Sequence, residues 1–358
     1  MKHLAVLALS TACLLAGSAR PAVADDLADA VRGVRIAQGE FRKRTLSSLN
    51  LDVEMRAITK AIDSGKLSPA RSAFAHYYRA TAGNLVNAVR VRNGERLDIA
   101  LAQSTLKDYE KVIADGTDAA GVTNAMYGAG SVARAHLGDL PAAYRYWDKC
   151  AQRGHAGCMN IMAWARVTGI AGIPISIPEA LDLHKKVYAT GTKFICAGVF
   201  SASAIGHIIH FAGLKPADGD ELEWFRRAVA LNDQVAEEQK GSDPCHRAGL
   251  EIDQYLVRLS RGDDRKELLR SARERATRED DKPIVEYLLG KLSDQQLRQA
   301  ASGVRERNVS CNMFFTAWWK AQLAKNAALA REHRGLMAKE EGNRCENHLA
   351  LVRLKSGN

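Results

Sequence analysis

Two pairs of polar residues in this chain have a spacing at which side chains can act together. Ser104 and Lys107 form an SxxK sequence; on a helix the lysine lies one turn from the serine, where its amine can help to remove the hydroxyl proton. His207 and His210 have the same spacing, and two imidazoles on one helix face can bind a metal ion. The two pairs could therefore support hydrolysis through a serine, or a metal centre.

Neither pair has the partners that its chemistry requires. No SDN or KTG sequence accompanies the SxxK, so Ser104 and Lys107 are also consistent with an ordinary exposed helix. No third ligand is evident near the histidines, and the apolar stretch 194–214 around them favours partly buried side chains in a helix interface. That stretch has no charged residue, but its Gly, Ser and His content argues against a membrane span. We expect no catalytic residue, no cofactor and no metal.

The N-terminus has the pattern of a secretory signal peptide over residues 1–24. Lys2 precedes an apolar segment over 4–17, and Ala22 and Ala24 form a small-x-small cleavage site. Cleavage near Ala24 predicts a periplasmic or secreted protein. A lipoprotein anchored at Cys13 is the alternative, but this cysteine lies inside the apolar segment. Removal of the peptide leaves six of the seven cysteines, an even number that indicates disulfides in an oxidising compartment.

The composition favours an all-helical protein that does not bind nucleic acid. Alanine, leucine, arginine and glutamate dominate, proline is rare, and few runs alternate apolar with polar residues. The formal net charge of +10 becomes +8 when Lys2 and Arg20 leave with the signal peptide. A basic balance could suit anionic lipid headgroups, an acidic partner or nucleic acid. Basic and acidic residues are interspersed, however, as in Arg273-Glu274-Arg275, and this pattern favours solvated helix faces.

Start and stop signals divide the chain into consecutive helices. Ser68-Pro69 is a helix start, an N-cap followed by proline at the first helical position, and Asn93-Gly94 is a break. A Gly138-Asp139 turn joins helices expected over 124–136 and 141–152. Helix pairs of this kind normally stack on copies of themselves. The predicted fold is an all-α, right-handed solenoid of stacked antiparallel helix pairs.

In the stretch 124–169, small and aromatic residues follow the Gly138-Asp139 turn at positions 143, 147 and 150, and small residues lie between Gly154 and Gly169. These intervals resemble those of the tetratricopeptide repeat and of its SEL-like variant. In cysteine-rich members of that variant, two cysteines at this interval are bonded, so the resemblance implies a Cys150–Cys158 disulfide. The matching positions are Tyr127, Ala143, Trp147, Cys150, Gly154, Cys158, Ala163 and Gly169.

The run 283–354 resembles the final repeats of exported tetratricopeptide proteins, through Leu289-Gly290, Ser293, Cys311 and Cys345. The spacing of Cys, Ala and Arg at 158, 163 and 166 recurs at 345, 350 and 353. Adjacency of successive first helices suggests Cys196–Cys245 and Cys311–Cys345 bridges, although the sequence leaves the pairing of these four cysteines open. We divide the chain into the signal peptide 1–24, N-terminal helices 25–66, repeats 67–262 and C-terminal helical repeats 263–358.

The resemblance implies a binding or scaffold protein that docks a protein or peptide partner in the cell envelope, without catalysis. An envelope hydrolase or penicillin-interacting protein of the cysteine-rich SEL-like type is the alternative. The sequence identifies neither the partner nor the oligomeric state. Trp318 and Trp319 are adjacent, so at most one is expected to face the core easily. An exposed one would be a binding anchor, whereas packing in the repeat core is the favoured interpretation of these aromatic residues.

Three residues are candidate partner contacts, because the first helices of stacked pairs line the concave side. Tyr127 and Arg134 are two helical turns apart and share a face, and Arg166 lies on the next first helix. Two arginines beside a tyrosine suit an acidic segment or a C-terminal carboxylate. The alternative is that Tyr127 is a packing aromatic and that the arginines bridge to acidic neighbours.

Overall fold

The structure, a computed structural model, describes residues 22–42, 49–116, 118–194, 196–239, 245–276, 278, 281–303, 309–340 and 345–356. These residues form helices that pack in consecutive pairs, and no strand occurs among them, which confirms the predicted fold class. The expected signal peptide lies outside the described residues up to position 21. None of the described helices is long and apolar enough to cross a membrane.

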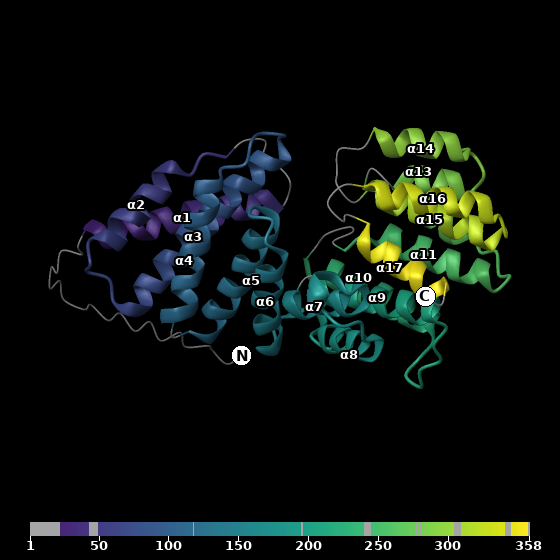
Figure 1. Cartoon of the computed structure of the whole chain (residues 1–358), viewed down its shortest axis with the longest axis horizontal. Helices are drawn as coiled ribbons and strands as arrows, with labels where there is room; N and C mark the ends of the chain where they lie inside the picture. Colours follow the sequence, from purple (N-terminus) through teal and green to yellow (C-terminus); the bar gives the residue numbers. More distant parts are fainter. Residues whose placement is uncertain are drawn as a thin grey trace, which may run out of the picture. The chain divides into compact units, whose positions relative to one another are not determined.

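The chain divides into two compact units, Met1–Gly138 and Asp139–Asn358 (Figure 1). The boundary falls at the turn expected to join a helix pair over 124–136 and 141–152. The earlier of these helices packs on the helix before it and the later one on the helix after it. The units therefore divide within the stretch that the sequence assigns to one run of repeats.

The first unit contains helices that each pack on the next one in the chain. Ser68 accepts a hydrogen bond from the backbone of Arg71 at the start of the third helix, so the Ser68-Pro69 start signal is confirmed. Asp98 and Asp118 cap the next two helices in the same way. The helices are α1 (Ala22–Arg42), α2 (Asp52–Asp63), α3 (Pro69–Arg92), α4 (Ile99–Asp115) and α5 (Ala119–Ala135).

A buried carboxylate links three helices of the first unit. Asp108 of α4 accepts two hydrogen bonds from Arg79 of α3, at 2.7 and 2.8 Å, and its Oδ1 lies 2.7 Å from Nδ1 of His76. Arg79 also donates to Thr59 of α2 at 3.1 Å. Burial raises the pKa of Asp108, but the hydrogen bonds and charges of Arg79 and His76 outweigh it, so this pKa lies below its usual value. The network therefore favours the ionised carboxylate in the folded state.

Replacement of Asp108 by Asn should lower the free energy of unfolding by roughly 3 kcal/mol, because Arg79 would be left without its counter-ion. The contribution of the ionised carboxylate is present above the unfolded pKa of about 3.9 and is lost as pH falls through the lower folded pKa. The wild-type protein should therefore lose more stability than D108N between pH 5 and pH 3. Urea unfolding monitored by circular dichroism measures both effects.

Asp115→Asn is the matched control, since this exposed residue of the same helix pairs only with Lys111 across the helix surface. Its loss should stay below about 1 kcal/mol. Equal effects of the two substitutions would contradict a clamping role for Asp108.

The second unit consists of helices that follow one another along the chain, two of them short 3-10 helices (η1 and η2) among the described residues. Its elements are α6 (Leu140–Gln152), α7 (Ala156–Thr168), η1 (Ile170–Gly172), α8 (Ile177–Tyr188), η2 (Gly191–Lys193), α9 (Ala197–Ala212), α10 (Glu221–Gln239), α11 (Arg247–Ser260), α12 (Lys266–Glu274), α13 (Asp281–Leu288), α14 (Asp294–Ser302), α15 (Val309–Leu323), α16 (Ala327–Lys339) and α17 (Glu346–Ser356). We call the odd-numbered helices from α7 to α17 the first helices.

The last helix returns to the beginning of the second unit. α17 packs against α9 and α7, and it lies beside α9 in Figure 1. Arg353 donates a hydrogen bond of 3.3 Å to the carbonyl oxygen of Thr168 at the end of α7. Repeats of an open solenoid contact only their neighbours. The second unit therefore departs from a simple open row, because α17 contacts helices near the opposite end of the unit.

Both adjacent tryptophans are buried, at 3% and 2% exposure, so both pack in the core, and the expectation that at most one of them faces the core is wrong. The ring of Trp318 packs against Phe315, and that of Trp319 lies 4.7 Å from Phe211. The reason is the position of α15, which packs against α11, α13, α14, α16 and α17. A helix covered on several sides buries side chains all round its axis.

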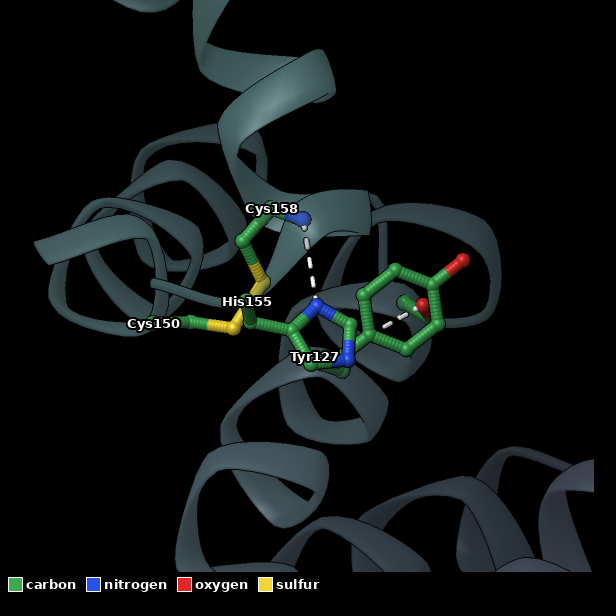
Figure 2. Close-up of a disulfide and its surroundings, with 5 residues drawn as sticks. Tyr127, Cys150, His155 and Cys158 are labelled. Atoms are coloured by element: carbon green, nitrogen blue, oxygen red, sulfur yellow. Dashed lines mark hydrogen bonds between the residues drawn. A yellow bond between two sulfur atoms is a disulfide. The ribbon is translucent and has the colours of Figure 1, made fainter. Parts of the chain in front are cut away.

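Three disulfides join the cysteines of the second unit in the combinations suggested by the sequence. Cys150 at the end of α6 bonds Cys158 in the first turn of α7 (Figure 2). Cys196 lies immediately before α9, and Cys245 lies just before α11. Their bond joins these first helices. The Cys311–Cys345 bond joins α15 to the start of α17. Two bridges therefore connect successive first helices.

The disulfides should differ in their effect on stability according to the loops that they close. Their sequence separations are 8, 49 and 34 residues, for which chain entropy predicts about 2.5 kcal/mol for the shortest and about 4 kcal/mol for the others. We expect C150A/C158A to be the least destabilised of three double variants in urea unfolding. Each variant should keep its helical circular dichroism. A larger decrease in the free energy of unfolding for C150A/C158A than for the other two variants would contradict the effect expected from loop length.

Candidate functional site

A pocket of about 280 Å³ lies among the first helices of the second unit. Every first helix from α7 to α17 contributes to its lining. We call it the central pocket. Its lining includes Trp164, Phe200, His207, Asp253, Phe315 and His348.

One wall of the central pocket is a fixed chain of charged and polar groups. His246 Nε2 lies 2.5 Å from Oδ1 of the buried Asp281, and Nη1 of Arg278 lies 3.1 Å from Nδ1 of His246. A guanidinium can only donate, so Nδ1 accepts and Nε2 carries the proton. The imidazole packs closely over Gly249, where a Cβ would lie 2.5 Å from its Cε1. Both ring nitrogens of His246 are therefore occupied, and neither is left to act as a general base.

A second wall holds a carboxylate next to a histidine. His207 Nε2 of α9 lies 3.4 Å from Oδ1 of Asp253 on α11. The alignment is not that of a hydrogen bond, and this nitrogen is shielded from solvent with no hydrogen-bond partner among the described residues. Polar atoms in that state are costly unless a ligand or water meets them. The His207–Asp253 pair therefore has unused capacity for polar contacts.

His348 of α17 completes the polar lining. Its ring lies 4.8 Å from that of Phe315, and its Nδ1 is shielded, with no hydrogen-bond partner in the part of the chain that the structure describes. Burial lowers the pKa of this imidazole to about 4; the charge of His207 adds to the shift and that of Asp253 opposes it. The ring is therefore neutral at pH 7, with one nitrogen that can accept a hydrogen bond.

The remaining lining is aromatic and aliphatic. Trp164 of α7 is half-buried, Phe315 of α15 is buried, and Phe200 of α9 is 48% exposed. A phenylalanine so exposed beside a pocket offers apolar area that a ligand can cover. Aromatic surface and unpaired polar atoms in one concavity are the features of a binding site.

The two histidines of the sequence pair have different partners. His207 faces Asp253 in the central pocket, whereas His210 lies 3.5 Å from Glu221 and its ring is 5.0 Å from that of Trp319. Burial lowers the pKa of His210 to about 4, opposed by its hydrogen bond to Glu221. In the first unit, Ser104 and Lys107 are both exposed on α4.

The candidate partner contacts fall in both units. Tyr127 and Arg134 are exposed on α5 of the first unit, Tyr127 at 40%. Arg166 belongs to α7 of the second unit, where it pairs with Glu179 at 2.8 Å and donates to the carbonyl of Pro174. Arg166 therefore bridges to an acidic neighbour, which is the alternative to a partner contact stated in the sequence analysis.

One group of described residues has metal-ligand geometry. Ligand atoms of Cys150, His155 and Cys158 lie within 4.8 Å of one another. The two sulfurs are joined to each other, and His155 Nδ1 accepts a hydrogen bond of 3.3 Å from the Cys158 backbone N–H, as Figure 2 shows. In this oxidised form the sulfurs are not thiolate ligands, and the histidine caps α7.

Comparison with known proteins finds similarity among solved structures. No protein-family profile and no curated protein matches the chain. Among solved structures, the chain is similar to a protective antigen present in uropathogenic Escherichia coli strains that displays an SLR fold, with 14% identity and a TM-score of 0.35. The match covers 85% of this chain and 64% of the antigen's chain.

The buried histidines predict a loss of stability on mild acidification. Burial also lowers the pKa of His184 to about 3, and unfolded histidine has a pKa of about 6.5. Below pH 6.5 the unfolded chain binds protons that the folded chain does not, so the free energy of unfolding should fall, by up to about 1.4 kcal/mol per pH unit for each such histidine. Urea unfolding at pH 7, 6 and 5 measures this slope.

His348→Gln removes one of these titrations and should make the decline shallower. Asn347→Gln, on the exposed neighbouring residue, should leave the wild-type slope unchanged. An identical slope in all three proteins would show that His348 is not held neutral in the folded state.

Proposed function

We propose that the protein is a binding module of the cell envelope that docks a peptide segment of a protein partner in the central pocket. The proposal rests on Phe200, an exposed aromatic side chain at a concavity where nitrogens of His207 and His348 have no hydrogen-bond partner among the residues described. An apolar anchor beside unsatisfied polar groups suits a peptide, which offers both side chains and backbone amides.

The pocket supports binding in preference to hydrolysis. His246 is engaged at both nitrogens by Arg278 and Asp281, and Ser104 and Lys107 are exposed on a helix of the other unit. A nucleophile requires a base within hydrogen-bond reach. We therefore propose a role without intrinsic catalysis.

Export to the envelope is the second part of the proposal. Three disulfides persist only in an oxidising compartment in ordinary cells, and residues 1–24 have the pattern of a signal peptide. We propose cleavage near Ala24. Both features point to the periplasm or the exterior of the cell.

Tyr127 and Arg134 remain proposed contacts of the first unit for an acidic segment. Both are exposed on one helix, α5. Arg166 has a weaker claim, because its guanidinium already ties α7 to Glu179 and to Pro174.

Phe200→Ala should weaken peptide binding by about tenfold or more, because burial of a phenylalanine side chain contributes about 1.5–3 kcal/mol. The test begins with selection of peptides from a random displayed library on the purified mature protein. Fluorescence anisotropy of the enriched peptides then measures Kd for the wild type and the variant.

Ile175→Ala is the matched control, since this residue of the same unit is 60% exposed and lies outside the central pocket. It should leave Kd unchanged. The proposal fails if the library yields no binding peptide, or if Phe200→Ala and Ile175→Ala bind the enriched peptides as tightly as the wild type.

A further inference from the structure

The two carboxylates of the central pocket differ in charge compensation. Asp281 is buried and receives hydrogen bonds from His246 and from the backbone of Arg278. Asp253 has no lysine or arginine within 4.0 Å among the described residues, and its close ionisable neighbour is His207. The Asp253 side chain is 23% exposed. It is therefore a partly desolvated carboxylate without a described cationic partner.

Three aromatic residues line the same pocket as this carboxylate. The faces of Trp164, Phe200 and Phe315 carry negative electrostatic potential, which attracts cations. His348 is neutral at pH 7, as its lowered pKa implies, and so does not repel one. The guanidinium of Arg278 also lines the pocket, in the wall where it contacts His246. Away from that wall, the combination of a carboxylate with aromatic rings and a neutral imidazole favours a positively charged group and disfavours an anion.

The size of the pocket limits what that group can be. Its volume of about 280 Å³ lies just below the range of about 300–1,000 Å³ for small-molecule sites. A single long side chain fits this size better than a folded segment. A bound metal ion fits less well, because no three His, Cys, Asp or Glu ligand atoms of the described pocket residues lie within 4.8 Å of one another.

We propose that the central pocket takes a lysine side chain of the docked peptide, with its ammonium against Asp253 and its methylene chain against Trp164, Phe200 and Phe315. This inference rests on the proposed peptide-binding function and names the chemical class of the anchor. The net charge of +10 disfavours a cation at long range. Recognition therefore depends on short-range contacts inside the pocket, which salt screens less than surface charges.

The test compares each enriched peptide with the same peptide acetylated at its lysine. Acetylation removes the charge and keeps the alkyl chain. We expect enriched peptides to contain lysine, and we expect acetylation to raise Kd by about tenfold or more for the wild-type protein. Asp253→Asn should bind the unmodified and acetylated peptides alike, whereas Asp182→Asn, an exposed carboxylate on α8, should behave as the wild type.

The outcomes separate this inference from the function on which it rests. Peptides that lose affinity with Phe200→Ala but are indifferent to acetylation would leave peptide docking intact and overturn the lysine anchor. Enriched peptides without lysine would do the same. Stoichiometric Zn²⁺ binding that displaces the peptide and disappears in His207→Ala would identify a metal site instead. A library without any binder would remove both proposals. The acetylation comparison uses the wild-type protein, so it does not depend on the folding of a variant.

Discussion

The contact of α17 with α7 and α9 is the constraint on which the second unit depends. Arg353 places its guanidinium on the carbonyl of Thr168, where the last residues of a helix leave oxygen atoms unsatisfied and the helix dipole is negative. Leu351 and Val352 are buried in the same contact region. Without this contact the first helices would form an open row. With it they surround a pocket, and His348 comes to face His207 and Asp253.

The disulfides act on the same geometry. Two of them connect successive first helices, at the starts of α9 and α11 and between α15 and α17. They restrict the spacing of the helices that line the central pocket. The first unit is held differently, because the ionised Asp108 binds α4 to Arg79 of α3, which reaches Thr59 of α2. Helix pairs of similar appearance therefore rely on covalent links in one unit and on a buried ion network in the other.

The central pocket contains locally unfavourable features that the surrounding packing holds in place. His246 has a positive φ of 67°, a backbone conformation that non-glycine residues rarely adopt. His207 and His348 each keep a shielded nitrogen that no described residue meets with a hydrogen bond. Such costs persist where packing over-determines the local structure, and they are concentrated at sites of function. Here the packing comes from α15 and α17 and from the disulfide next to His246.

The sequence by itself determined the helical class and several helix starts, because these depend on residues close together in the chain. The Ser68-Pro69 start is an example, since an N-cap acts within one helical turn. The resemblance to the SEL-like repeat implied the Cys150–Cys158 pair. The sequence left the pairing of the other four cysteines open, and the tertiary structure decided it. The site required the tertiary structure: His207, Asp253 and His348 come from α9, α11 and α17, and no local spacing relates them. The burial of both Trp318 and Trp319 followed likewise from the helices that cover α15. Local patterns fix which residues share a helix face, whereas the helices that pack against that face are decided by contacts between distant segments.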